Sequence, residues 1–95
     1  MRAVFRRDAE EEFQEATRWY DHQSKGLGIE FMDSIDAAIE RIVQQPESYP
    51  VVHRKTRMAV VRRFPYLILY RLETSTIVIV AVFHAKRDPR SWKSR

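Results

Sequence analysis

The side chains best suited to chemistry gather in the second half of the chain, around two apolar runs. Arg63 precedes the first run, and His84 and Arg87 follow the second. Of these, the histidine is the side chain that exchanges protons most readily near neutral pH. Further basic and aromatic side chains in this half are Lys55, Arg57, Lys86, Arg90 and Trp92. Such a surface would attract nucleic acid, ribosomal RNA or an acidic protein, and its alternative role is simply to keep the chain in solution.

The charge is divided unevenly along the chain. Residues 1–47 hold six Lys/Arg and eleven Asp/Glu, a net charge of −5, whereas residues 48–95 hold eleven Lys/Arg and two Asp/Glu, a net charge of +9. The overall charge of +4 therefore conceals an acidic half and a strongly basic half. The basic half is where we expect an anionic partner to bind.

Several classes of site are missing from the sequence. There is no cysteine nucleophile, no His-x-x-x-His or carboxylate cluster with the spacing of metal ligands, and no glycine-rich phosphate loop. We therefore expect no metal and no cofactor. Sequence-specific DNA binding by this chain also lacks a recognition helix, because both expected helices are acidic on their polar faces.

The apolar runs are short, and the N-terminus is interrupted by charge. The longest wholly apolar run, Ile77–Phe83, cannot span a bilayer, and Arg2 and Arg6 break up any secretory signal. The sequence predicts a protein of the cytoplasm without a membrane partner. Its 95 residues predict one domain, 1–95.

The first half of the chain is expected to form a strand and two helices. Ala3–Phe5 reads as a short strand, and residues 9–22 carry apolar side chains at helical spacing. Asp8 is expected to cap that helix in a capping box with Glu11. After Gly26-Leu27-Gly28 a second helical stripe begins, which Pro46 ends, so the helices should form an antiparallel hairpin.

The second half of the chain is expected to form three strands. After a loop over 46–53, the residues in 58–62, 66–72 and 76–83 are rich in β-branched and aromatic side chains. The last run is apolar at every position from Ile77 to Phe83, which predicts a strand buried on both faces near the centre of the sheet. The fold class is thus α+β, in the order strand, helix, helix, strand, strand, strand. The helical hairpin would pack on one face of a small, mainly antiparallel sheet, and a partner protein is one candidate to cover the other.

This order of elements, together with several local motifs, resembles the RelE/ParE family of type II toxins. The motifs are Gly26-Leu27-Gly28, Gln45-Pro46-Glu47-Ser48, the strand Arg63-Phe64-Pro65-Tyr66-Leu67-Ile68-Leu69-Tyr70, Ile79–Val82, His84 and Arg87-Asp88-Pro89. The resemblance runs over nearly the whole chain. It implies a small, basic, cytoplasmic bacterial toxin that inhibits growth, serves in plasmid stabilization and is held inactive by a cognate antitoxin. DNA would be contacted only through the antitoxin complex.

The family divides into two functional branches. Members similar to RelE cleave mRNA on the ribosome without a metal, and members similar to ParE block DNA gyrase. The resemblance implies that Arg63 and Arg87 would contact phosphate in an endoribonuclease, with His84 as its acid or base, and that Lys55 and Arg57 lie where such enzymes carry lysines. The tyrosine that serves several of these enzymes near the C-terminus is absent, because Trp92 occupies roughly that region.

This absence favours the ParE-like branch and leaves open whether the chain is an enzyme. On that hypothesis the target-binding residues are Lys55, Arg57, Lys86, Arg90 and Trp92, and the target is DNA gyrase rather than the ribosome and mRNA. A third interpretation is a toxin-like fold that has lost its toxicity and persists as a binding partner.

Each of these residues also has a structural alternative. Arg63 could neutralise an acidic helix such as the one that carries Glu10–Glu12, and His84 could cap or pack at a strand end. Trp92 could belong to the core or, beside arginines, to a protein interface.

Overall fold

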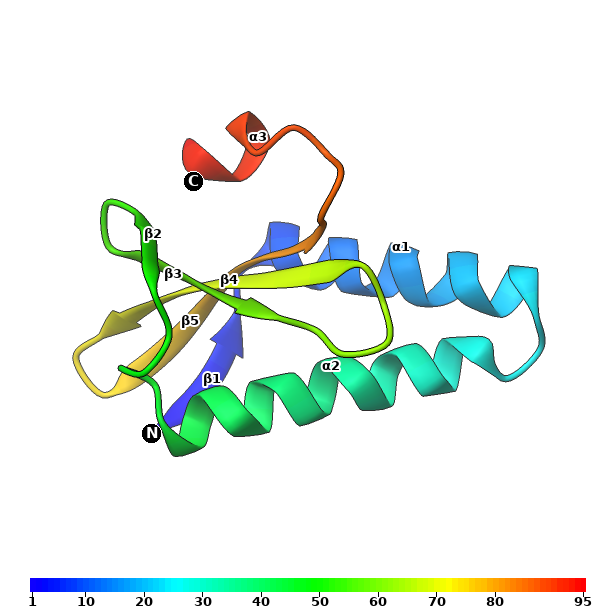
Figure 1. The fold of residues 1–95 in the computed structure, drawn as a ribbon, viewed down its shortest axis with the longest axis horizontal. Helices are drawn as coiled ribbons and strands as arrows, with labels where there is room; N and C mark the ends of the chain where they lie inside the picture. The colour runs from blue at the N-terminus through cyan, green and yellow to red at the C-terminus, as the bar shows by residue number, and fades with distance from the viewer.

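The computed structural model describes all 95 residues as a five-stranded sheet with three helices (Figure 1). In chain order the elements are β1 (Arg2–Phe5), α1 (Arg7–Gln23), α2 (Leu27–Gln44), β2 (Val51–His53), β3 (Thr56–Val60), β4 (Tyr66–Glu73), β5 (Thr76–His84) and α3 (Arg90–Lys93). The expected α+β class and order are confirmed, and the structure adds β2 and α3. None of the three helices combines the length and the hydropathy that a membrane crossing requires.

The sheet has the strand order β1-β5-β4-β3-β2, with β1 parallel to β5 and every other pair antiparallel. The strand β5 therefore lies inside the sheet, and most of its side chains are buried, as its uniformly apolar sequence predicts. The strand β2 was expected to be loop. It pairs with the start of β3 and forms the edge of the sheet.

The two long helices form the expected hairpin, but their ends are capped differently from the expectation. The cap position of α1 is Arg6, without a side-chain cap bond, so the capping box of Asp8 and Glu11 is wrong. The capping carboxylate lies at the helix–helix connection instead, where Oδ1 of Asp21 accepts hydrogen bonds from the backbone N–H groups of Gly26 (3.0 Å) and Gly28 (3.3 Å). A Cβ atom at Gly28 would lie 2.9 Å from the carbonyl oxygen of Thr17, so a glycine there lets the helices approach closely.

The main core lies between this hairpin and one face of the sheet. Aromatic side chains dominate the end near the hairpin connection, where the ring of Phe31 lies 5.0–5.2 Å from those of Tyr20, Phe64 and Tyr66. The buried members of this core are Ala9, Ala16, Phe31, Ile35, Ala38, Ile42, Ala59, Val61, Phe64, Ile68, Tyr70, Ile77, Ile79 and Val82.

The opposite face of the sheet is covered by the chain itself. The four-residue helix α3 lies over this face (Figure 1). Its Trp92, which is only 6% exposed, packs against Leu69, Val80, Ala81 and Phe83. The expectation of a partner protein over this face is therefore wrong for the part that α3 covers. One tryptophan suffices there because its indole buries more apolar surface than any other side chain.

A bulge in β5 supplies this second core. Tyr70 pairs with Ile79 and Leu69 with Ala81, so Val80 has no partner on β4. The extra residue breaks the alternation of side chains, and both Val80 and Ala81 join the second core.

Beyond this bulge, side chains replace the missing strand next to β5. The strand β1 pairs only as far as Phe5 with Ile79, after which the chain turns into α1. Glu12 then accepts a hydrogen bond from the backbone N–H of Val82 (3.1 Å), and Arg95 donates one to the carbonyl of Val80 (3.0 Å). The same two side chains form an ion pair, with Nη2 of Arg95 2.8 Å from Oε2 of Glu12. Only 14% of each side chain is exposed.

We expect Glu12→Gln to lower the free energy of unfolding by about 3 kcal/mol, because the Arg95 guanidinium would stay largely buried without its carboxylate. Urea denaturation measures this difference. The matched control is Glu15→Gln, at an exposed position of the same helix, which should change the value by less than about 0.5 kcal/mol. Equal small effects of both substitutions would contradict the importance of the Glu12–Arg95 pair.

A second buried polar contact joins the sheet to the loop after α2. Tyr70 is completely buried, and its hydroxyl donates to the carbonyl of Pro46 across 2.6 Å. Burial raises the pKa of this phenol from 10.0 to about 12.

We expect stability to fall as the pH rises from about 10 to about 12. In this window the folded phenol of Tyr70 keeps its proton while the unfolded one loses it, so the unfolded state binds fewer protons. Tyr70→Phe should cost about 1 kcal/mol at pH 7 through the lost hydrogen bond, and the variant should lose less stability than the wild type across the alkaline window. Urea titrations of both proteins at several pH values test this, and parallel losses would refute it.

Candidate target-binding surface

The candidate site lies at the end of the sheet where β4 begins and β5 finishes. Tyr66 and His84 are register partners there, with ring centroids 5.2 Å apart in an edge-to-face arrangement. The turn that follows is held by the imidazole, whose Nδ1 accepts a hydrogen bond from the backbone N–H of Lys86 (3.1 Å). His84 therefore caps the turn after β5 and packs against Tyr66. This is the structural role that the sequence offered as an alternative to catalysis.

This hydrogen bond limits what His84 can do chemically. While Nδ1 accepts this bond, the neutral imidazole carries its proton at Nε2 and can donate from it. Burial, followed by the nearby Tyr20, raises the pKa of Tyr66 against an opposing effect of Arg87, so its phenol stays protonated at neutral pH. In this arrangement the two side chains both present hydrogen-bond donors.

Two exposed cations lie directly beside this pair. Lys86 and Arg87 follow His84, and neither has a carboxylate partner within ion-pair distance. The guanidinium of Arg87 lies 5.7 Å from the centroid of the Phe83 ring, which holds its stem while leaving its charge in solvent.

Arg90 is exposed too, but its charge is partly engaged. Its Nε donates to Oδ2 of Asp88 across 2.7 Å, and its backbone N–H donates to Oδ1 across 3.0 Å. These hydrogen bonds lower the pKa of Asp88 and keep it ionised beside Arg90. A target would have to compete with this local pair.

Arg63 lies apart from the other two candidates for catalysis. Its Nη2 lies 2.6 Å from Oε1 of Glu30 on α2, and no hydrogen bond or ion pair joins it to His84 or Arg87. The alternative that Arg63 neutralises an acidic helix describes this contact, although the helix is α2 and not the one that carries Glu10–Glu12. Its backbone has a φ of 73°, at the turn into β4.

The remaining expected target-binding residues are dispersed. Lys55 lies in the turn between β2 and β3, at the other end of the sheet. Arg57 is used internally, because its Nη1 donates to the carbonyls of Glu47 (3.0 Å) and Tyr49 (2.7 Å). Trp92 belongs to the second core, as one of the two structural alternatives for this residue predicts. A target would therefore reach its indole only if α3 moved.

The buried role of Glu12 was not predicted, although the sequence contains a signal for it. Glu12 lies three residues after Ala9 and four before Ala16, both buried, so it falls on the inward stripe of α1. A carboxylate on such a stripe calls for a buried partner. That partner, Arg95, lies 83 positions away in sequence, and the Glu12 hydrogen bond raises its pKa above the ordinary value.

A family model and a solved structure are similar to this chain, the first in sequence and the second in fold. The family model described as "ParE toxin of type II toxin-antitoxin system, parDE" matches residues 3–89. A solved structure titled "Chromosomal ParDE TA system from P. aeruginosa" is similar in fold, with a TM-score of 0.68 at 13% identity, over 90% of this chain and 97% of that one. Curated protein sequences give no significant match.

We expect Arg57→Ala to lower the free energy of unfolding by about 1.5–3 kcal/mol, because two charge-assisted hydrogen bonds to the loop before β2 are lost. Arg90→Ala, which removes an equal charge from a fully exposed position, should leave it almost unchanged. Thermal and urea unfolding of the two variants provide the measurement. Stability unchanged in Arg57→Ala would return Arg57 to the candidates for target binding.

Proposed function

The chain belongs to the ParE toxin family of type II toxin–antitoxin systems, and on that basis we propose that it inhibits growth by binding DNA gyrase. A cognate antitoxin neutralises it. The proposal requires the toxin to act in the cytoplasm, where gyrase works, and its contribution to plasmid stabilization follows from the pairing of toxin with antitoxin.

The gyrase proposal rests on two cations without ion-pair partners, which lie beside an imidazole whose Nδ1 already accepts a hydrogen bond. Lys86 and Arg87 present charge to solvent, whereas Nδ1 of His84 is engaged by the backbone. Binding to an acidic patch of a protein uses such cations and needs no proton transfer, so the engaged imidazole does not impair it. Electrostatic complementarity of this kind accelerates association and orients the partner.

The same geometry argues against the alternative, a ribosome-dependent mRNA endoribonuclease. Such an enzyme needs a base for the 2′-hydroxyl, an acid for the leaving 5′-oxygen and cations at the phosphate. The backbone engages Nδ1 of His84, and Arg63 contacts Glu30 rather than His84 or Arg87. This arrangement favours the binding proposal over the endoribonuclease.

The antitoxin needs apolar surface, and the helical hairpin provides it. Trp19, Ile29 and Met32 are 58%, 63% and 41% exposed. Beside Met32 lies a groove of about 450 Å³, into which Phe5 and Phe13 also project. We assign an amphipathic segment of the antitoxin to the groove beside Met32, in place of the sheet face that α3 already covers.

Inducing the chain without its antitoxin should produce filamentous cells and a DNA-damage response, as expected of a gyrase poison. His84→Ala should leave this effect intact, whereas Arg87→Glu should abolish it because it reverses the charge of the surface. Arg87→Lys is the matched control and should retain most of the effect. Microscopy, a damage-response reporter and transcript sequencing provide the readouts.

Three outcomes would contradict the proposal. Rapid arrest of translation with cut transcripts, lost in His84→Ala, would support the endoribonuclease. Full toxicity of Arg87→Glu would mean that the cationic surface is not needed for activity. No effect on growth from the folded wild type would support a fold that has lost its toxicity.

A further inference from the structure

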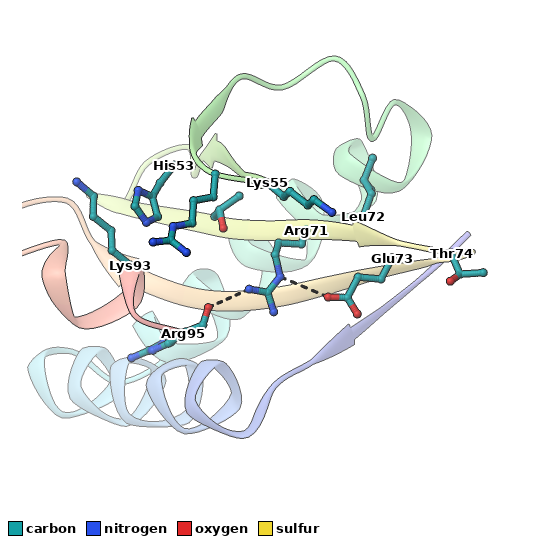
Figure 2. A pocket seen from close by; sticks show the side chains of 10 residues that line it. His53, Lys55, Arg71, Leu72, Glu73, Thr74, Lys93 and Arg95 are labelled. Atoms are coloured by element: carbon teal, nitrogen blue, oxygen red, sulfur yellow. Dashed lines mark hydrogen bonds and ion pairs between the residues drawn. The ribbon is translucent and has the colours of Figure 1, made fainter.

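A second basic site lies at the opposite end of the sheet from His84. It is a hollow of about 580 Å³ between the β2–β3 turn, the β4–β5 hairpin and α3 (Figure 2). Only one of its ten lining residues, Leu72, is hydrophobic. Its charged side chains are Arg54, Lys55, Arg71, Glu73, Lys93 and Arg95.

The positive charge of this hollow is mostly uncompensated. Five Lys/Arg side chains face one carboxylate, Glu73. The charge of Arg95 is offset by Glu12 and Asp8, which lie outside the hollow. Arg54, Lys55 and Lys93 form no ion pair with any carboxylate of the chain. Three free cations therefore surround the opening.

The floor of the hollow is a fixed guanidinium. Nη1 of Arg71 donates to the backbone carbonyl of Arg95 across 2.9 Å, which sets the plane of the group (Figure 2). Its Nε is buried and makes no hydrogen bond, although Oε2 of Glu73 lies 3.4 Å away. The Nε is inaccessible to a ligand, so Arg71 contributes its fixed positive charge to the hollow rather than a free donor.

The two turns that frame the hollow are held in an uncommon conformation. Arg54 has a φ of 53° and Thr74 a φ of 48°, both in the left-handed region that non-glycine residues rarely adopt. Both residues line the hollow. Two-residue hairpin loops require such φ values, so these tight turns fix the positions of Arg54 and Thr74 at the hollow.

We propose that this hollow binds phosphate groups of a nucleic-acid backbone. Guanidinium and ammonium groups match phosphate oxygens, and several cations around one hollow suit a polymer that carries a charge on every nucleotide. An acidic protein segment fits less well, because protein interfaces rely on an apolar or aromatic centre that this hollow lacks. Binding is independent of base sequence, since backbone contacts carry no sequence information.

This inference does not depend on gyrase, and it departs from the expectation that DNA is contacted only through the antitoxin complex. That expectation rested on the acidic faces of the long helices. The hollow is built instead from the β2–β3 turn, the β4–β5 hairpin and the segment from Lys93 to Arg95. Of the residues expected to bind a target, only Lys55 lines it.

The test compares two triple variants of the full chain that remove the same charge. Arg54→Ser/Lys55→Ser/Lys93→Ser empties the hollow of free cations, whereas Arg7→Ser/Arg18→Ser/Lys25→Ser removes three exposed, unpaired cations from the helical hairpin. Binding to a fluorescein-labelled 20-nucleotide DNA of mixed sequence, single-stranded and duplex, is followed by fluorescence anisotropy at several salt concentrations. Melting temperatures check that both variants fold.

The hollow variant should bind at least tenfold more weakly than the wild type, and the slope of log K against log salt should fall by about 2 for three lost single-strand phosphate contacts. The hairpin variant should lose less than about threefold. Equal losses of DNA affinity in both variants would mean that only the net charge of the protein matters, which would overturn the proposal. So would undetectable DNA binding by the wild type, or tighter binding to a poly-glutamate peptide of equal charge.

Discussion

The fold depends on one ion pair that completes the hydrogen bonding of β5 beyond the end of β1. Where β1 ends, β5 would expose a carbonyl and an N–H to a largely buried environment, and unsatisfied backbone groups there are costly. Glu12 and Arg95 supply the acceptor and the donor, and they neutralise each other. The pair also ties α1 to the end of α3, so one interaction fixes both layers that cover the sheet.

Two contacts join the acidic first half of the chain to the basic second half. Arg95 reaches Glu12 in a largely buried pair, and Arg63 reaches Glu30 at the surface. The second half carries more cations than take part in these ion pairs. The excess remains at the two ends of the sheet, beside His84 and around the hollow that Arg71 floors.

The sequence predicted what local pattern determines. The helical stripes and the wholly apolar run of β5 are local, and the structure confirms both. The strand β2 and the helix α3 were missed because three and four residues are too few to show periodicity. The burial of Trp92 and the partner of Glu12 depend on contacts across the whole chain, which no local pattern contains. The residues of the candidate site were predicted from the sequence. Only the structure shows which of them form ion pairs, which are buried and which are cations without a partner.

The central claim is that the chain acts on gyrase through a cationic surface and without acid–base chemistry. The most direct measurement adds the purified chain to gyrase and relaxed plasmid DNA and follows supercoiling and cleaved complexes, with a ribosome-bound mRNA in a parallel reaction. The account predicts that supercoiling is inhibited and that the mRNA stays intact. Unimpaired supercoiling together with cleavage of the mRNA would contradict it.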